Sequence, residues 1–385
     1  MLYYLFEYLE QTFSPPGFQV FQFITVRAAL AGITALCIAL FAGRHIINWL
    51  SAKQLGERVR EGEDAGAVDH THKAGTPTMG GVIILLSISI ATLLWGAIAE
   101  TYVWLIMLAT LWMGLVGFID DYTKTVKKNK DGIPARAKVA AQVTIGLIVG
   151  SVLYFTPAFE PYHTTTYLPF IRDKVFDYHF FEGWFGAVDL GWIVYLPVTV
   201  FIMTAVSNAV NLTDGLDGLT TGVTAFVSLG LMVLCYASGN VVMAEFLDIM
   251  YLPGTGELTV FVAAMVAACF GFLWYNGYPA TVFMGDTGSL ALGAAIASLT
   301  LAIRKELLLP LLGAVYFLEA LSVIIQTGYF KYTKRRTGRG ERIFLMAPLH
   351  HHYEAKGTHE AKIVVRFWIV TAVTIIAALL TLRVR

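Results

Sequence analysis

Two adjacent aspartates, Asp120 and Asp121, lie in the segment "GFIDDY" at 117–122, which directly follows an uncharged apolar run at 104–116. Neighbouring carboxylates repel each other, and the partial negative charge of a helix C-terminus adds to that repulsion. If the helix continues through "DDYTKTVKK", Lys124 lies one turn after Asp120 and shares a face with the carboxylates. A divalent cation would offset the remaining repulsion, and Mg²⁺ binds through one or two carboxylates together with substrate phosphate oxygens. The alternative interpretation is a helix end with solvated charges.

A third acidic residue, Asp286, lies in the segment "FMGDTGSL" at 283–290. Free amides at a helix N-terminus suit a phosphate, and an acid among them suits a cation that bridges to this phosphate. An ordinary N-cap of the following helix would explain Asp286 and Ser289 equally well. Upstream, Asn276 and Phe283 could contact a nucleobase, although a belt of interfacial aromatic residues would also account for Phe283.

Four polar residues are spaced three apart in "SNAVNLTDGLDGLTTG": Asn208, Asn211, Asp214 and Asp217. In one continuous helix they would form a polar ridge. Such residues at a membrane end usually point at a ligand or at one another. The alternative is a helix that stops and restarts at the Asp-Gly pairs.

Other polar positions carry weaker signals. Successive residues of a helix point about 100° apart, so the histidine triplet at 350–352 cannot easily share one ion, and phosphate binding, sugar binding or the positioning of a loop is the preferred interpretation. Lys73 lies in "HTHKAGTPTMGG", a Gly- and Thr-rich loop that suits an anion or a nucleobase carbonyl. Glu319 and Gln326 are seven residues apart and therefore share a helix face.

The composition indicates an integral membrane protein, because 57% of the 385 residues are hydrophobic and only 14% are charged. The formal net charge is zero, which gives no argument for a nucleic acid or another polyanion as a partner. The three cysteines lie in apolar runs without CxxC spacing, so neither a disulfide framework nor a thiolate metal site is indicated. The first twenty residues lack a basic n-region and do not resemble a cleavable signal peptide.

Ten apolar runs are long enough for about twenty helical residues. We therefore predict an all-α integral membrane protein with ten transmembrane helices in a single domain, residues 1–385. The predicted spans are 23–48, 79–98, 102–119, 138–156, 192–211, 219–237, 258–275, 288–303, 307–330 and 363–382.

Basic residues are concentrated in alternate gaps between these runs. Of the 27 Lys and Arg residues, five lie in 44–78, six in 120–138 and eight in 331–362. The positive-inside rule makes these gaps cytoplasmic and places both termini outside. Four polar segments then fall on the cytoplasmic side, which predicts one site there: 120–121, 211–218, 283–290 and 348–357. The predicted cytoplasmic loops are about 49–78, 120–138, 212–218, 276–287 and 331–362, and the predicted periplasmic segment is about 157–191.

Several motifs, taken together and in this order, resemble the polyprenyl-phosphate N-acetylhexosamine-1-phosphate transferases. These motifs are "KAGTPTMGG", "GFIDDYTK", "NAVNLTDGLDGL", "FMGDTGSL", "EALSVIIQTGYFK" and "APLHHHYEAKG". The resemblance runs nearly end to end, with small departures such as Ala320 where threonine is expected. The histidine triplet followed by Tyr353 and Glu354 favours the branch whose donor is UDP-N-acetylmuramoyl-pentapeptide.

The resemblance implies an enzyme of the bacterial inner membrane with ten spans and both termini periplasmic. It implies transfer of phospho-N-acetylmuramoyl-pentapeptide from the UDP carrier to undecaprenyl phosphate, which yields lipid I and UMP for peptidoglycan synthesis. Mg²⁺ is implied as the cofactor. The implied partners are these two substrates and membrane lipids, with no nucleic acid, and the resemblance is compatible with a homodimer.

The resemblance also implies roles for individual residues. Asp120 is the suspected base, Asp121 completes the aspartate pair, and Asp286 is the magnesium ligand. Lys73, Asn276 and Phe283 hold uridine, with Phe283 stacked on the uracil. The other implied residues are Lys124, Lys128 and Lys138 at the phosphates, Asn208, Asn211, Asp214 and Asp217 near the nucleotide, and Gln326, His350, His351 and His352 on the side of the muramoyl peptide.

Two mechanisms and two other functions stay open at this point. The reaction is either a single in-line displacement at the β-phosphorus with Asp120 as base, or a two-step route with Asp286 as covalent nucleophile. Transfer of N-acetylglucosamine-1-phosphate is the nearest alternative function. A cation-coupled transporter or flippase would carry acidic groups near the bilayer midplane in repeated halves. The sequence shows Glu319 alone there and no repeat.

Overall fold

The computed structural model describes residues 1–53, 73, 75–129, 131–162, 164–168, 171, 175–178 and 190–382. These residues form helices, as the predicted all-α fold requires, together with one short two-stranded hairpin. Most of the predicted cytoplasmic loop at 49–78 and much of the predicted periplasmic segment at 157–191 lie outside the described residues.

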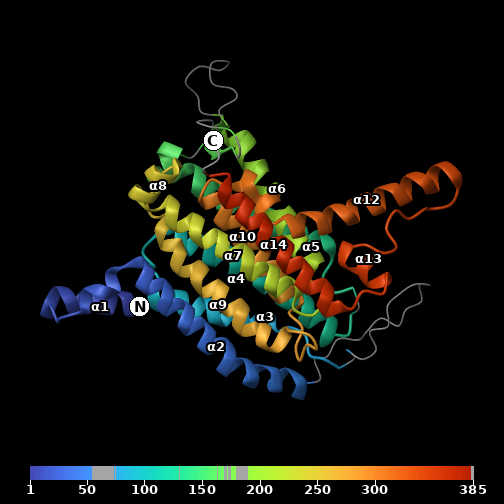
Figure 1. Cartoon of the computed structure of the whole chain (residues 1–385), viewed down its shortest axis with the longest axis horizontal. Helices are drawn as coiled ribbons and strands as arrows, with labels where there is room; N and C mark the ends of the chain where they lie inside the picture. Colours follow the sequence, from blue (N-terminus) through green and yellow to red (C-terminus); the bar gives the residue numbers. More distant parts are fainter. Residues whose placement is uncertain are drawn as a thin grey trace.

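The long helices form one bundle with α10 (Gly285–Ala302) at its centre (Figure 1). Residues 287–302 of α10 are all buried, and many of them are Gly, Ala or Ser, which lets neighbouring helices approach closely. The helices that pack against α10 are α3 (Gly81–Trp95), α4 (Thr101–Thr125), α6 (Trp192–Thr213) and α7 (Leu219–Ser238). An outer set packs on these helices: α2 (Ile24–Ala52), α5 (Ala135–Phe155), α9 (Leu258–Asn276) and α14 (Glu360–Leu380).

Short elements occupy the ends of the bundle. The strands β1 (Thr165–Tyr167) and β2 (Val175–Asp177) pair antiparallel, and the Tyr167 amide donates to the Arg304 carbonyl at 3.0 Å, which ties this hairpin to the end of α10. The remaining short elements are α1 (Leu2–Phe13), η1 (Phe18–Gln22), η3 (Pro157–Tyr162), α8 (Val241–Leu247), η4 (Thr255–Glu257), η5 (Glu306–Leu308) and α13 (Leu349–Ala355).

Within the described part of the chain, seven helices are long and apolar enough to cross a membrane, and an eighth is added if one bent pair counts as a span. The protein is therefore a multi-pass membrane protein. Helix lies at each of the ten predicted positions. The helix α3 has only 15 residues, about 22 Å, which is shorter than the hydrocarbon core of about 30 Å. The prediction of ten crossings is thus confirmed only in its coarser form.

The predicted span at 307–330 is not straight. The chain bends by 85° between Glu306–Leu312 and α12 (Ala314–Thr337), so that α12 projects from the bundle (Figure 1). Within the first part, α11 (Leu309–Leu312) contains Pro310, which has no amide proton to donate, and Gly313 follows with the freedom to turn sharply. A hydrophobicity count detects the length of such a run and not the break inside it.

Two glycines allow the neighbouring helices to contact the N-terminus of α10. A Cβ atom on Gly117 of α4 would lie 2.1 Å from the Asp286 carbonyl oxygen. A Cβ atom on Gly81 of α3 would lie 2.2 Å from the Gly288 nitrogen. Because both obstacles are backbone atoms, no rotation of a side chain can relieve them.

We expect Gly117→Ala to destabilise the protein by about 1–3 kcal/mol, because α4 and α10 must separate to admit the methyl group. Thermal unfolding of the purified protein in detergent measures the change. The control is Gly328→Ala on α12, where a Cβ atom meets nothing within 4 Å and alanine favours the helix by up to about 1 kcal/mol. Equal unfolding temperatures for the two variants would contradict the close contact.

Candidate active site

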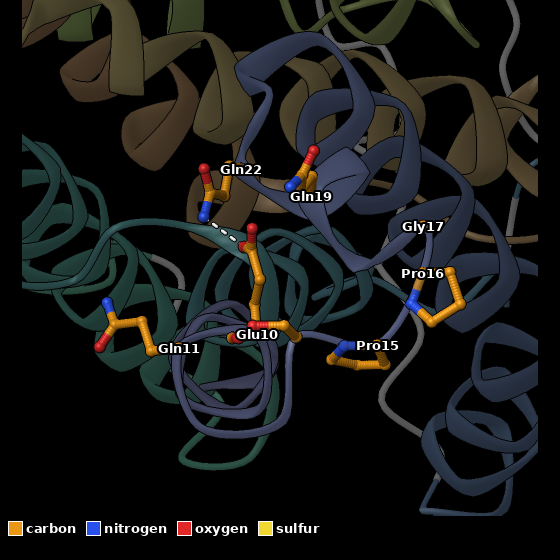
Figure 2. Close-up of a pocket in the computed structure, with 8 residues that line it drawn as sticks. Glu10, Gln11, Pro15, Pro16, Gly17, Gln19 and Gln22 are labelled. Carbon is orange, nitrogen blue, oxygen red and sulfur yellow. Dashed lines mark hydrogen bonds between the residues drawn. The ribbon is translucent and has the colours of Figure 1, made fainter.

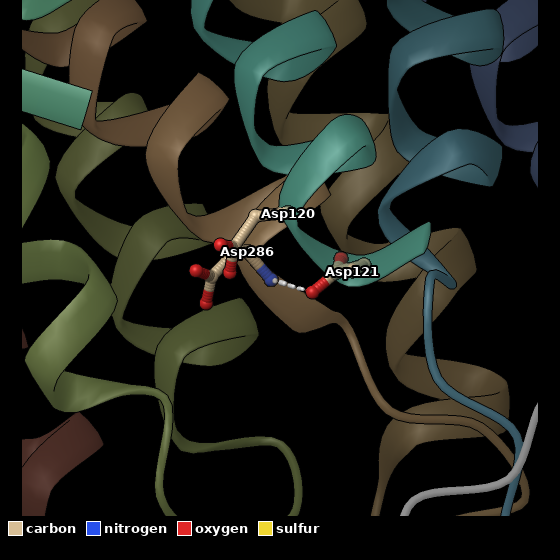
Figure 3. A group of neighbouring side chains, drawn as sticks. All are labelled: Asp120, Asp121 and Asp286. Atoms are coloured by element: carbon tan, nitrogen blue, oxygen red, sulfur yellow. Dashed lines mark hydrogen bonds between the residues drawn. The ribbon is translucent and has the colours of Figure 1, made fainter. Parts of the chain in front are cut away.

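Three carboxylates meet where α4 ends and α10 begins (Figure 3). Asp120 and Asp121 lie in the last two turns of α4, and Asp286 lies in the first turn of α10. Each offers an oxygen, and these three oxygens lie within 4.8 Å of one another. Asp120 and Asp121 are buried, and Asp286 is partly exposed. The structure thus brings together the two motifs that sequence analysis placed on the same side.

Two lysines compensate the charge of Asp120. The Lys124 ammonium lies 2.6 Å from Asp120 Oδ2, and the Lys138 ammonium of α5 lies 2.8 Å from the same oxygen. The Ile133 amide donates to Asp120 Oδ1 at 2.8 Å. The predicted pairing of Asp120 with a lysine one helical turn later is confirmed.

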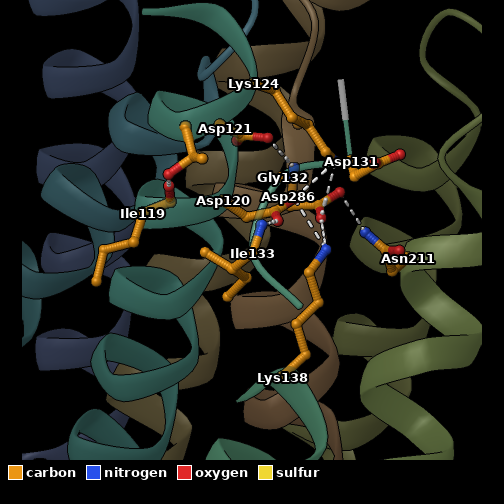
Figure 4. Close-up of polar contacts among 12 residues, drawn as sticks. Ile119, Asp120, Asp121, Lys124, Asp131, Gly132, Ile133, Lys138, Asn211 and Asp286 are labelled. Carbon is orange, nitrogen blue, oxygen red and sulfur yellow. Dashed lines mark hydrogen bonds and ion pairs between the residues drawn. The ribbon is translucent and has the colours of Figure 1, made fainter. Parts of the chain in front are cut away.

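Asp286 is held by the same lysines and by one amide (Figure 4). Its Oδ2 lies 2.6 Å from the Lys138 ammonium and 3.4 Å from the Lys124 ammonium. The Asn211 side chain of α6 donates to Asp286 Oδ1 at 2.8 Å and also to Ser289 at 2.8 Å. Both lysines therefore bridge Asp120 and Asp286.

Asp121 has a different environment from its neighbour. Its Oδ1 accepts from the Asp286 amide at 3.1 Å, and its Oδ2 accepts from the Thr287 amide at 2.9 Å and the Thr287 hydroxyl at 2.7 Å. The residue before α10, Met284, makes no side-chain cap, so Asp121 caps this helix from α4. Asp121 thus fixes the backbone that carries Asp286.

The donor set fits a hard divalent cation. Three carboxylates against two ammonium groups leave one net negative charge, and carboxylate oxygens are the ligands that Mg²⁺ prefers. Asp286 is the best placed of the three, because it is partly exposed whereas Asp120 and Asp121 are buried.

A second polar cluster surrounds Lys73. Its ammonium lies 2.8 Å from Asp217 Oδ1 and 2.6 Å from Glu360 Oε1. Burial opposes the charge on Lys73, but the hydrogen bonds and charges of the two carboxylates outweigh it and raise the pKa of Lys73 above its usual value. Lys73 therefore stays protonated at neutral pH.

The loop that carries Lys73 runs beside the loop before α10. The Phe283 amide donates to the Pro77 carbonyl at 2.8 Å, and the Gly80 amide donates to the Phe283 carbonyl at 2.9 Å. The Lys73 ammonium lies 6.0 Å from the centroid of the Phe283 ring. The two motifs lie about 200 residues apart in the sequence but are neighbours in the fold, so that Lys73 and Phe283 lie close to each other.

The buried side chain of Asn276 supports the loop that carries Phe283. Its side chain accepts from the Thr221 hydroxyl at 2.7 Å and donates to the Val282 carbonyl at 3.0 Å. Both contacts lie within the protein. They fix the turn that presents Phe283.

The polar ridge expected at 208–217 is not one helix, because α6 ends at Thr213. Asn211 reaches the carboxylates, whereas Asn208 lies one turn deeper and donates to the Gln142 side chain at 3.2 Å. Asp214 and Asp217 follow the helix end, so the alternative of a helix stop at the Asp-Gly pair is correct. Lys128 lies in the exposed turn after α4, with φ of 54°.

Gln326 and the histidines form a separate group around α13. Gln326 accepts from the amides of Ile343 and Phe344, both at 3.0 Å, and so holds the chain before α13. The three rings have different partners, as the helical spacing predicts. His350 Nδ1 lies 3.2 Å from Glu319 Oε2, His351 Nδ1 lies 2.9 Å from Glu354 Oε2, and His352 Nδ1 accepts from the Leu345 amide at 3.1 Å.

Burial lowers the pKa of His350 despite the nearby Glu319 carboxylate, so the ring is neutral at pH 7. A Cβ atom on Gly215 would lie only 2.2 Å from the Nε2 atom of His350. The ring therefore packs on the turn between α6 and α7.

Two residues that contribute to these clusters cannot be recognised from the sequence. Glu360 is one, because a carboxylate in the first turn of a helix is common and has no chemical signature. Gln142 lies one turn after Lys138 and is fully buried, but a single amide in an apolar run gives no indication of its partner.

Two hollows lie away from the carboxylates. One of about 440 Å³ lies at the turn between α1 and η1, where Glu10, Pro15 and Gln22 line it and the Gln22 amide donates to Glu10 (Figure 2). An apolar one of about 530 Å³ is lined by α5 and α6 residues such as Leu147 and Pro197. Neither is lined by a predicted site residue.

Known proteins share these motifs. The family model described as glycosyl transferase family 4 matches residues 103–304, a range that holds the three clustered aspartates. A signature described as phospho-N-acetylmuramoyl-pentapeptide-transferase signature 1 matches residues 73–85, which begin at Lys73.

Full-length relatives carry the same description. A phospho-N-acetylmuramoyl-pentapeptide-transferase of Salinibacter ruber is 72% identical over 385 residues, which is 100% of both chains. Relatives of the same name from Chloroherpeton thalassium and Flavobacterium psychrophilum are 51% and 47% identical, again over 100% of both chains. The chain therefore belongs to glycosyl transferase family 4 and, within it, to the family of the phospho-N-acetylmuramoyl-pentapeptide-transferases.

Proposed function

We propose that the protein transfers phospho-N-acetylmuramoyl-pentapeptide from its UDP carrier to undecaprenyl phosphate and releases UMP. The product is lipid I, the first membrane-bound intermediate of peptidoglycan synthesis. The observation that carries this proposal is the identity of 72%, over the whole length of both chains, with a protein named for this transfer. N-acetylglucosamine-1-phosphate transfer and transport are disfavoured, because the relatives reported above share that name.

The lysine–carboxylate cluster suits this chemistry. A lipid phosphate must attack a diphosphate, so two anions meet and further negative charge develops on the transferred group. Lys124 and Lys138 place two ammonium groups beside Asp286, where we propose that the transfer takes place. We propose that Asp286 holds Mg²⁺ beside them, with Asp120 nearby. When bound, Mg²⁺ supplies positive charge that stabilises the transferred phosphoryl group.

Asp120 is the proposed base for the carrier phosphate. The ammonium groups of Lys124 and Lys138 lie within 2.8 Å of its Oδ2 and form hydrogen-bonded ion pairs with it. Little help from a base is needed, because a phosphate monoester loses its second proton at about pH 6 and is mostly dianionic at neutral pH. The main contribution of Asp120 is then to orient Lys124 and Lys138 toward the phosphates.

We propose that Asp286 is a metal ligand and not a covalent nucleophile. Lys138 at 2.6 Å and Asn211 at 2.8 Å engage both of its oxygens, so its lone pairs are already stabilised. A carboxylate in this environment attacks phosphorus poorly. This favours direct attack by the carrier phosphate over a two-step route.

The second cluster is the proposed uridine site. Lys73 and Phe283 offer a cation and an aromatic ring 6.0 Å apart, which suits a flat base with carbonyl oxygens. Asn276 supports that site through Val282. On the side proposed for the muramoyl peptide, Gln326 and His352 act through the chain segment that they hold at 343–345.

We also propose that the chain crosses the cytoplasmic membrane of a bacterium ten times. Seven spans, the bent α11–α12 pair, the short α3 and the buried α10 make up that number among the described helices. An even number of crossings places both termini on one side, and the distribution of Lys and Arg makes this the periplasmic side. The carboxylates then face the cytoplasm, where the UDP-linked donor is soluble.

The enzyme should release UMP from UDP-N-acetylmuramoyl-pentapeptide only with Mg²⁺ and undecaprenyl phosphate, and not from UDP-N-acetylglucosamine. Asp286→Asn should lower this rate by at least about 100-fold, because the variant loses the charge that binds the metal. Glu245→Gln, which neutralises an exposed carboxylate of α8, is the control and should retain the rate. Metal-dependent release by Asp286→Asn at the normal rate would contradict the assigned ligand.

The stereochemical outcome at the β-phosphorus distinguishes the two routes. A single displacement inverts the configuration, whereas two successive displacements retain it. We expect inversion when a donor with a chiral thio-substituted β-phosphorus is converted and the product is analysed by ³¹P NMR. Retention would show that a covalent intermediate forms.

Labelling of single cysteines tests the topology. In a Cys37→Ala background, which removes the exposed native thiol, Gln11→Cys should react with an impermeant maleimide in intact spheroplasts. Lys127→Cys, in the exposed turn after α4, should react only after permeabilisation. The reverse pattern would place the carboxylates on the outer side.

A further inference from the structure

Glu360 is the first residue of α14 and lies among residues of the proposed uridine site. Only 7% of its surface is exposed. Its Oε1 accepts from the Lys73 ammonium at 2.6 Å and from the Asp217 amide at 2.7 Å. One buried oxygen thus joins the start of α14 to a lysine and to a peptide group that lie far away in the sequence.

Asp217 is the second carboxylate that holds Lys73. Its Oδ1 accepts from the Lys73 ammonium at 2.8 Å, and its Oδ2 accepts from the Ala280 amide at 2.9 Å. The ammonium group is therefore fixed by two carboxylates, each of which is itself anchored to a backbone amide. Such a donor is held in place before a ligand arrives.

The sum of charges differs between the two clusters. Around Lys73, one ammonium and two carboxylates leave one net negative charge. Around Asp286, three carboxylates, two ammonium groups and the proposed Mg²⁺ leave one net positive charge. A diphosphate is repelled by the first cluster and attracted by the second, whereas a neutral base is not repelled by the first.

We propose that Glu360 is a positioning and specificity-determining residue, which fixes the ammonium group of Lys73 and makes its surroundings accept a neutral nucleobase and reject phosphate. This inference rests on the proposed function, because it assigns the Lys73 cluster to the base of the UDP-linked donor. It adds α14 to the elements that build the nucleotide site.

The variant Glu360→Gln tests this role, because its amide oxygen can still accept the hydrogen bonds while the charge is lost. We expect KM for the UDP-linked donor to rise roughly tenfold or more, with kcat changed by less than about threefold. Inhibition by uridine should weaken, while inhibition by inorganic pyrophosphate should strengthen or stay the same. Glu360→Asp, which keeps the charge, should fall between Glu360→Gln and the unaltered enzyme.

The matched control is Glu257→Gln, which removes a carboxylate from the ion pair with the buried Arg27, where the Arg27 guanidinium donates to Glu257 Oε2 at 2.7 Å. It should lower the unfolding temperature without changing KM. Equal loss of uridine and pyrophosphate inhibition in Glu360→Gln, or an unchanged KM, would overturn the inference. If Glu360→Gln fails to fold, the same comparison in Glu360→Asp decides. Failure of the proposed function would appear separately, as absence of UMP release by the unaltered enzyme.

Discussion

The rest of the structure depends on how three carboxylates are held together at the ends of apolar helices. Their mutual repulsion is offset in two separate ways. Lys124 and Lys138 neutralise Asp120 and Asp286, while the positive N-terminal end of α10 binds Asp121. The second way requires α4 to touch the α10 backbone, and Gly117 is the residue that allows this contact. Helix packing and site electrostatics are therefore a single constraint.

Local spacing made part of this arrangement predictable. The continuation of α4 through Thr125 and the pairing of Lys124 with Asp120 follow from the helical period alone. The distribution of Lys and Arg among alternate loops predicted that Asp286 lies on the same side of the membrane as this pair. Sequence analysis treated Asp120 and Asp121 as one unit, yet adjacent helical residues point about 100° apart, so one meets the lysines and the other meets α10. Their separate partners depend on packing over 160 residues.

The other departures share this cause. The end of α6 at Thr213 and the bend at Gly313 are backbone events inside apolar runs, to which a hydrophobicity count is insensitive. Glu360 has an ordinary local context, and its importance comes from Lys73, which lies 287 residues away. Gln326 is predicted to lie on the side of the muramoyl peptide, and in the structure its side chain accepts from the backbone amides at 343–344. A sequence predicts which groups are polar, whereas the fold decides whether each one meets a ligand or the protein itself.

The two clusters are joined by the elements that build them. The last turn of α6 supplies Asn211 to the carboxylates, and the turn that follows supplies Asp217 to Lys73, only six residues later. The segment between α9 and α10 supplies the Ala280 amide to Asp217 and leads directly into the first turn of α10, where Asp286 lies six residues later. A displacement of either segment must therefore alter both clusters. A ligand that spans them from base to phosphate would bind segments whose separation is already set by α6 and α10, so less ordering would remain to be done on binding. In the proposed site, anchoring of the base would then bring the β-phosphorus to the lysines.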